Sequence, residues 1–143
     1  MSGLHIEDFY KVAGRSLVIL FQVFPRPVPI YVEAICGPYR PDEYGVHSRR
    51  RQACFATLLW LAEEGFIRCD DTIRQEAIDQ AVLTGRCFTN LLKASPKDPD
   101  PDLPPSVQTE RQTYAYQLSE AVQKKSTKDI EDVMIQLLSA MTT

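Results

Sequence analysis

Residues 59–68 read LWLAEEGFIR, and this stretch decides the fold because a helix has to end inside it and a strand has to begin. Apolar side chains recur at helical spacing up to Gly65, and glycine is the residue type that most often ends a helix. The aromatic and β-branched residues of FIRC (66–69) are typical of a strand. We therefore expect a long helix from Arg49 to Glu64, capped by Ser48, and a short strand after it.

The residues before this helix predict two more helices. The first runs from about Ile6 to Phe24, and its second half is apolar nearly all round, so it should lie at the centre of the core. The prolines of RPVP (26–29) then force an extended link. A short helix from Ile30 to Ile35 follows, and Gly37 ends it.

One segment after the expected strand has two possible structures. Residues 70–72 read as a turn. Residues 73–84 carry apolar side chains at helical spacing, yet AVLT (81–84) ahead of GRCF (85–88) also reads as a strand that leads into a capped helix. We favour the strand, on the resemblance given below, and expect the last helix of this domain from Arg86 to Lys93.

The C-terminal third separates into a linker and two helices. Residues 94–105 hold five prolines and three aspartates, which predicts a stiff, extended linker between a domain at 1–93 and a helical extension at 106–143. The helices, from Gln108 to Lys124 and from Lys128 to Met141, each have one apolar face. Either the chain's own domain or the same tail of a second copy must cover these faces. In a homodimer the contact residues would be Leu118, Val122, Ile130, Val133, Met134, Leu137 and Leu138.

The order helix, short helix, long helix, strand, turn, strand, helix resembles that of a winged helix-turn-helix domain of the bacterial type, over about residues 6–93. LWLAEEGFIR looks like the end of the recognition helix and the start of the wing. VLTGRCF (82–88) is similar to the second wing strand and the start of the last helix. The resemblance implies a mostly α fold with a small β-hairpin, and a protein that acts by binding.

Three consecutive arginines, Arg49, Arg50 and Arg51, begin the long helix. Positive charge at this end opposes the helix dipole and costs about 0.3–1 kcal/mol per residue, so stability alone would favour Asp or Glu there. In a winged helix these positions would meet the major groove, and arginine suits contacts with guanine and phosphate. A solvated face, or salt bridges to acidic neighbours, is the alternative reading. The other candidate contact residues are Arg40, Arg68, Arg74, Tyr39 and Tyr44.

Two kinds of partner stay open, with DNA as the first choice and a protein as the alternative. Double-stranded DNA, with regulation of transcription as the usual consequence for the resembled family, would be bound by the arginine helix and the wing. A protein partner would use the same surface together with Tyr39 and Tyr44, since tyrosine and arginine are enriched at protein interfaces. The wing also carries carboxylates, which repel phosphates. The charge of the wing, and the presence of acidic neighbours beside the arginines, therefore discriminate between the two partners. The wing carboxylates are Asp70, Asp71, Glu76 and Asp79.

The remaining features exclude several classes of protein. The four cysteines lie in separate segments without the spacing of a zinc or redox motif, so we expect no metal and no cofactor. Cys54 and Cys69 occupy positions that suit a small apolar residue, and we expect both to be buried free thiols. Phosphate-binding loops and nucleophile motifs are absent from the sequence, so we do not expect an enzyme. No apolar run approaches the length of a membrane span, and the first residues do not resemble a signal peptide. These two observations predict a cytoplasmic protein without a membrane partner.

Overall fold

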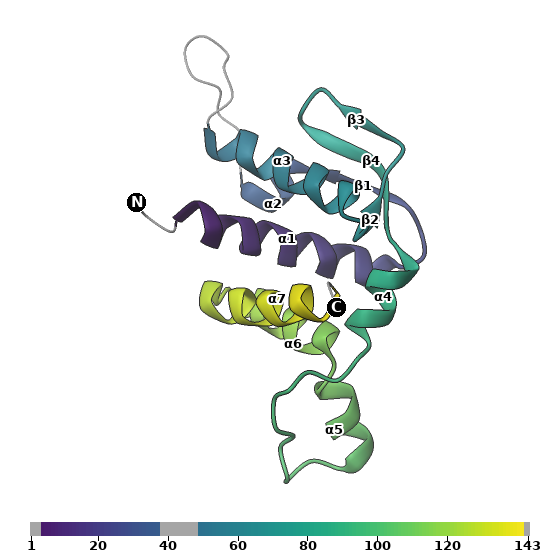
Figure 1. The fold of residues 1–143 in the computed structure, drawn as a ribbon, viewed down its shortest axis with the longest axis vertical. Helices are drawn as coiled ribbons and strands as arrows, with labels where there is room; N and C mark the ends of the chain where they lie inside the picture. The colour runs from purple at the N-terminus through teal and green to yellow at the C-terminus, as the bar shows by residue number, and fades with distance from the viewer. Residues whose placement is uncertain (1–3, 38–48, 142–143) are drawn as a thin grey trace.

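The computed structural model describes residues 4–37 and 49–141, which form a mostly helical structure with a small antiparallel sheet (Figure 1). The expected fold class is confirmed at this level. The elements in chain order are α1 (Leu4–Val23), β1 (Val28–Tyr31), α2 (Val32–Cys36), α3 (Arg49–Glu63), β2 (Ile67–Arg68), β3 (Asp71–Ile73), β4 (Ala77–Leu83), α4 (Gly85–Leu91), α5 (Pro105–Arg111), α6 (Tyr114–Gln123) and α7 (Thr127–Met141).

α1 lies in the middle of the molecule, as its apolar composition predicts. Figure 1 shows α2, α3 and the sheet on one side of it and α6 and α7 on the other. A helix that is apolar nearly all round can be buried on opposite faces at once, so one core joins the N-terminal and C-terminal parts of the chain. The most buried side chains of α1 are those of Val12, Ala13, Leu17, Val18 and Leu20.

β4 is the central strand of the sheet. It pairs antiparallel with β1, β2 and β3, and the strand order is β1-β4-β2 with β3 also beside β4. The strand favoured at residues 81–84 is confirmed, and it begins earlier, at Ala77. The turn expected at 70–72 is misplaced, because residues 71–73 pair with β4 and the turn follows at Arg74 and Gln75.

The short helix expected from Ile30 begins two residues later than predicted. Residues 28–31 form β1, in which Ile30 lies opposite Ile78, and α2 starts at Val32. Ile30 and Ile78 are both fully buried, so strand pairing satisfies the backbone while it buries two β-branched side chains. Gly37, with a φ of 97°, follows the end of α2 as predicted.

The single helix expected from Gln108 to Lys124 is two helices. α5 ends at Arg111, and Thr113 takes an extended conformation before α6 begins. The Thr113 hydroxyl accepts a hydrogen bond from the Tyr116 backbone N–H at 3.1 Å, which caps α6. The helix cap at Thr113 therefore divides residues 108–124 into two helices.

The linker is tied to the helices that follow it. Ala94 forms an isolated β-bridge with Thr113, and the backbone N–H of Ser95 donates to the Gln112 carbonyl at 2.7 Å. Ser95 is also buried. The N-terminal end of the linker expected at 94–105 is therefore anchored to the residues just before α6.

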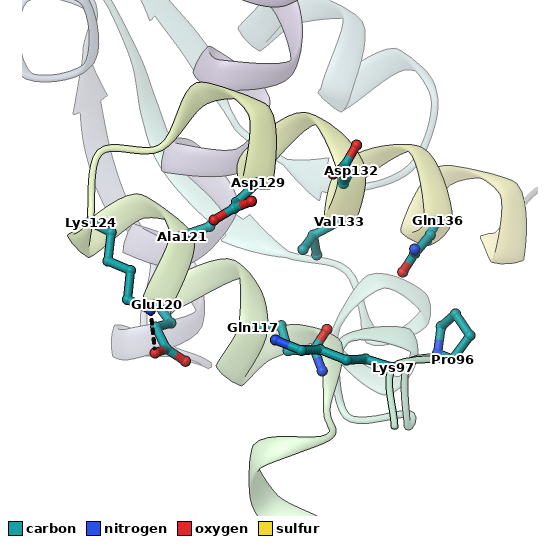
Figure 2. A pocket seen from close by; sticks show the side chains of 10 residues that line it. All are labelled: Pro96, Lys97, Gln117, Glu120, Ala121, Lys124, Asp129, Asp132, Val133 and Gln136. Atoms are coloured by element: carbon teal, nitrogen blue, oxygen red, sulfur yellow. Dashed lines mark ion pairs between the residues drawn. The ribbon is translucent and has the colours of Figure 1, made fainter. Parts of the chain in front are cut away.

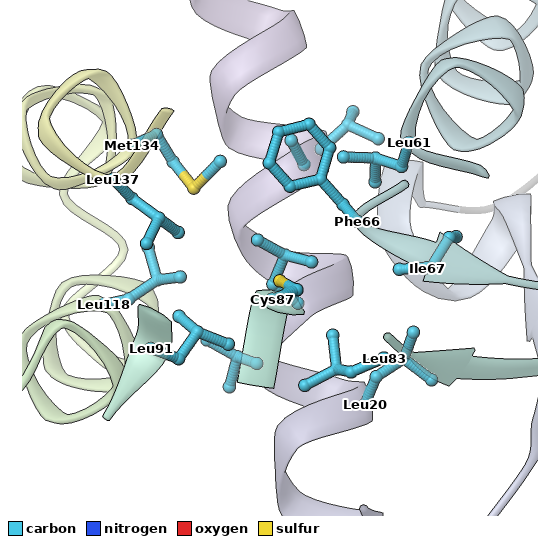
Figure 3. Close-up of a cluster of buried hydrophobic side chains, with 14 of the residues drawn as sticks. Leu20, Leu61, Phe66, Ile67, Leu83, Cys87, Leu91, Leu118, Met134 and Leu137 are labelled. Carbon is cyan, nitrogen blue, oxygen red and sulfur yellow. The ribbon is translucent and has the colours of Figure 1, made fainter. Parts of the chain in front are cut away.

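The C-terminal helices fold back on the chain's own domain. α6 and α7 pack on α1, and Figure 3 shows their side chains on one side of α1 with those of α3 and β2 on the other. The residues that would form the contact in a homodimer thus lie in the core of a single chain. Leu118, Ile130, Val133, Met134 and Leu137 are at most 8% exposed, and Val122 and Leu138 are half-buried against them.

Two contacts fix this docking. A Cβ at Gly14 of α1 would lie 2.7 Å from Ile130 Cγ2 and 3.2 Å from Leu118 Cδ1, so only glycine allows α1 to approach α6 and α7 this closely. At the other end, the Arg86 guanidinium donates a hydrogen bond to the Met141 carbonyl and holds the C-terminus of α7 against α4.

Candidate interaction surface

The first turn of α3 presents two arginines to solvent. Arg49 and Arg50 are both exposed, as predicted. Arg50 Nη2 lies 3.3 Å from Asp8 Oδ1 on α1, and the two side chains are 66% and 37% exposed, so solvent screens the pair and its contribution to stability is small. The pair does, however, place a carboxylate beside the arginine and weaken the positive potential that a phosphate would meet.

Arg51 does not belong to this surface. It is only 9% exposed, because it precedes Cys54 by three positions and Leu58 by seven, on the face of α3 that turns toward the core. Consecutive helical residues lie about 100° apart around the axis, so three adjacent arginines cannot all share one face. The burial of Arg51 makes it a poor candidate for contact with a partner.

The β-hairpin exposes two more of the predicted contact residues. Arg68 lies on β2, and Arg74 lies in the turn between β3 and β4. Arg74 and Gln75 have φ of 50° and 64°, and Glu76 N donates to the Ile73 carbonyl at 2.7 Å, as in a type I′ turn. Each non-glycine residue in this left-handed region costs about 1–2 kcal/mol, so stability alone would favour Asn and Gly.

Carboxylates outnumber arginines on the hairpin. Asp70 and Asp71 are exposed, and Glu76 and Asp79 are half-buried. Asp71 and Asp79 each accept a hydrogen bond from the backbone N–H of the next residue, at 2.7 Å and 2.9 Å, which fixes both carboxylates on the hairpin. Against these four carboxylates the hairpin has two arginines, so its own charge is negative.

The exposed arginines do not form one compact patch. α3 spans 15 residues, or about 22 Å. Arg49 and Arg50 stand at its start, and Arg68 follows its end. The predicted contact residues are therefore spread over both ends of the helix.

An aromatic side chain adjoins the hairpin turn. Tyr31 lies opposite Ala77, and Ala77 lies opposite Ile73, so the three residues form one row across the sheet and share a face. Tyr31 is 49% exposed, so it does not pack in the core, and Ile73 is half-buried. We call Tyr31, Ile73 and the adjacent Arg74 the sheet-face patch. The predicted contact residues Tyr39, Arg40 and Tyr44 lie outside the described residues.

Cys54, which the sequence predicts to be a buried free thiol, is joined to Cys36. Cys36 at the end of α2 and Cys54 in α3 form a disulfide across a sequence separation of 18 residues. No motif in the sequence reveals it, because the pair is brought together only when α2 packs on α3.

The other two cysteines, Cys69 and Cys87, are free, as predicted for Cys69. Burial raises the pKa of Cys87 to about 12, while Arg86 acts in the opposite direction. Burial, with the charges of Asp70 and Asp71, also raises the pKa of Cys69. Neither group is an activated thiol, since activation requires a lowered pKa.

A hollow of about 500 Å³ lies between the linker, α6 and α7 (Figure 2). On one wall, Lys124 Nζ pairs with Glu120 Oε1 at 2.9 Å. Asp129 and Asp132 of α7 and Lys97 of the linker also line the hollow. The sequence does not reveal this hollow because three separate segments form it. Its walls mix both charges, and none of the residues predicted to contact DNA or a protein partner lines it, although Val133 of the predicted homodimer contact does.

No family model, curated protein or solved structure matches this chain. Among the described residues, no group of three or more His, Cys, Asp and Glu side chains is placed to hold a metal ion. Within residues 4–37 and 49–141, no helix combines the length and the apolar character needed to cross a bilayer.

Proposed function

We propose that this chain is a winged-helix domain that acts by binding another protein. The order α1-β1-α2-α3-β2-β4 and the antiparallel strand order β1-β4-β2 support the winged-helix assignment. In this reading α2 and α3 are the helix-turn-helix pair and the hairpin of β2 to β4 is the wing. The contact surface consists of the sheet-face patch and the start of α3.

The placement of carboxylates beside the exposed arginines carries the choice of partner. Arg50 has Asp8 at 3.3 Å, and Arg74 projects from a hairpin with four carboxylates and one other arginine. Duplex DNA presents about one negative charge per 1.7 Å of axis and rewards an excess of positive charge. A protein surface rewards mixed charge that complements its own, and this chain offers mixed charge.

The sheet-face patch supports the same choice. Tyr31 and Arg74 are residue types that dominate the binding energy of protein interfaces, and Ile73 gives them an apolar neighbour. Tyr31 is about half exposed, which leaves surface available for a partner to bury.

Position-specific photo-crosslinking tests this surface. Benzoylphenylalanine replaces Tyr31 in one variant and Ile135, which is 45% exposed on α7, in a matched control. In an extract of the producing cell we expect a discrete protein adduct from the Tyr31 position, lost in the Arg74→Glu background, and none from the Ile135 position. Adducts of equal yield from both positions, or an adduct indifferent to Arg74, would contradict the proposal.

DNA is the second candidate partner, and one observation favours it. Arg49 and Arg50 are both exposed at the start of the helix that would be the recognition helix. Under this proposal the chain would contact phosphates through these two residues and act in transcription. The binding of a random DNA duplex separates the two proposals, because phosphate contacts make binding steeply dependent on salt.

A further inference from the structure

Two adjoining hollows follow α6 on the side of α1 opposite the sheet (Figure 1). The hollow of about 500 Å³ between the linker, α6 and α7 shares Lys97, Gln117 and Glu120 with a second hollow of about 310 Å³ between the linker, α5 and α6. Every residue that lines them lies between positions 96 and 136, within the part of the chain that the structure describes. We call the two hollows together the α6–α7 groove.

Six polar side chains line the larger hollow in two matching rows (Figure 2). They are Gln117, Glu120 and Lys124 on α6 and Asp129, Asp132 and Gln136 on α7. Both rows have the spacing i, i+3, i+7, which keeps the side chains on one face of a helix. Ala121 and Val133 also line the hollow and are only 4% and 8% exposed, so the base of the groove is apolar.

The α6–α7 groove has a negative charge. Its lining holds the carboxylates of Asp98, Asp100, Glu120, Asp129 and Asp132 and the cations of Lys97, Arg111 and Lys124. Lys124 is already held by Glu120 at 2.9 Å, and this hydrogen bond, with the charges of Glu120 and Asp129, raises the pKa of Lys124. Asp132 forms no ion pair with any described residue. A cation on a ligand would therefore pair with Asp132.

Glutamine side chains already hold backbone carbonyls at one end of the groove. Gln108 Nε2 donates to two carbonyls of the linker at 2.8 and 2.9 Å, and Gln112 Nε2 donates to a third at 3.1 Å. Gln117 and Gln136 line the larger hollow, and their amides form no such bond with any described residue. Each amide has two donors and an acceptor, which match the C=O and N–H groups of an extended backbone.

We propose that the α6–α7 groove binds an extended peptide segment of a partner protein, and that this segment carries a lysine or an arginine. The peptide backbone bonds to the amides of Gln117 and Gln136, and the cationic side chain pairs with Asp132. Apolar parts of the peptide cover Ala121 and Val133. This surface is separate from the sheet-face patch, so the inference does not rest on the proposed function.

The shape and charge of the groove favour a peptide over other ligands. Sites for small molecules are mostly apolar and bury most of the ligand, whereas this groove is open to solvent and has a polar lining. A nucleic acid would meet five carboxylates against three cations. A basic peptide has the charge that complements this lining.

Selection from a random peptide library tests the proposal. Phage that display peptides of about twelve residues are selected on the immobilised full chain, and clones that also bind an Asp132→Lys variant are removed. Glu131→Lys is the matched control, because Glu131 precedes Asp132 on α7 but does not line the groove. We expect the remaining peptides to be enriched in Lys and Arg. In fluorescence anisotropy they should bind Asp132→Lys about tenfold more weakly or worse, since the substitution places like charges together, and Glu131→Lys within about twofold of wild type.

Several results would overturn the proposal. These are the absence of clones that depend on Asp132, dependent clones without an excess of Lys and Arg, and equal losses of affinity in the two variants. Displacement of the peptides by spermidine at concentrations near their own Kd would assign the groove to a small polyamine instead. Thermal midpoints equal to that of wild type show that both variants are folded. Clones released by Arg74→Glu bind the sheet-face patch and bear on the proposed function, so failure of one proposal is distinguishable from failure of the other.

Discussion

Arg49, Arg50 and Arg51 are neighbours in the sequence with three different environments. Arg49 is exposed, Arg50 faces Asp8, and Arg51 is buried on the core side of α3. A variant that replaces all three would combine the loss of a surface charge with the loss of a core side chain. The test of the surface therefore requires Arg49 and Arg50 to be replaced without Arg51.

Replacement of these arginines one at a time should separate the two roles. Arg51→Ala should lower the free energy of unfolding by about 2 kcal/mol or more. The substitution removes the packing of a buried side chain together with the interactions of its guanidinium group. Arg49→Ala should change it by less than about 0.5 kcal/mol. Urea unfolding followed by circular dichroism measures both values. Equal effects would contradict the burial of Arg51.

Gly14 makes a second prediction at the residue scale. Gly14→Ala should lower the free energy of unfolding by about 1–2 kcal/mol, since the clash with Ile130 exceeds the gain in helix propensity. Gly85 in α4 is the matched control, because nothing lies within 4 Å of a Cβ built there. Gly85→Ala should be neutral or slightly stabilising. A stable Gly14→Ala variant would mean that α7 does not pack on α1 at this point.

Cys87 predicts how stability depends on alkaline pH. Its pKa is raised from 9.0 to about 12, so below pH 9 the thiol is protonated in both folded and unfolded chains and its contribution to stability is fully present. As the pH rises from 9 toward 12, the unfolded chain ionises first and that contribution is lost. Urea titrations at pH 8, 9 and 10 should show wild type losing up to about 1.4 kcal/mol per pH unit more than Cys87→Ala. Parallel pH profiles would contradict the burial.

At the scale of elements, the segments with local signals could be predicted from the sequence. α1, α3 and α7 have apolar residues at helical spacing over many residues. Gly37 follows the end of α2, and Gly65 follows the end of α3. β1 could not be predicted, because its strand character depends on pairing with β4 far along the chain. The division between α5 and α6 depends on the single cap at Thr113.

The candidate site could also be predicted only as far as local signals in the sequence reach. The sequence identifies which arginines begin α3 and which lie on the hairpin. It does not show that Arg51 turns inward, since that depends on which face of α3 meets the core. Nor does it show the disulfide, because the contact between Cys36 and Cys54 is tertiary. The exposure of Tyr31 follows from the register of β1 on β4, which is also tertiary.

Two neighbouring residues of α7 test whether this helix is part of the core. Met134 is fully buried, whereas its neighbour Ile135 is 45% exposed. Met134→Ala should lower the free energy of unfolding by about 2–5 kcal/mol, and Ile135→Ala by well under 1 kcal/mol. Chemical unfolding of both variants measures the difference. If the two variants were equally stable, α7 would not be part of the core.

At the scale of the whole molecule, the hydrophobic core is shared by the N-terminal and C-terminal parts of the chain, whereas the net charge is not. One hydrophobic core runs from the sheet through α1 to α6 and α7. The charge is uneven: the net value is −3, and residues 94–143 contribute eight acidic and five basic side chains. The part of the chain with the contact surface is therefore close to neutral, with arginines and carboxylates interspersed. This balance suits a protein partner of mixed charge better than a polyanion.

Binding of duplex DNA tests this account most directly. The full chain is titrated into a fluorescent random duplex of about 30 base pairs at about 50 and 200 mM salt, beside an Arg49→Ala/Arg50→Ala variant that keeps Arg51. We predict no saturable change in anisotropy at either salt concentration, and no difference between wild type and variant. Saturable binding by wild type that weakens steeply with salt and disappears in the variant would contradict the protein-binding account and establish DNA as the partner.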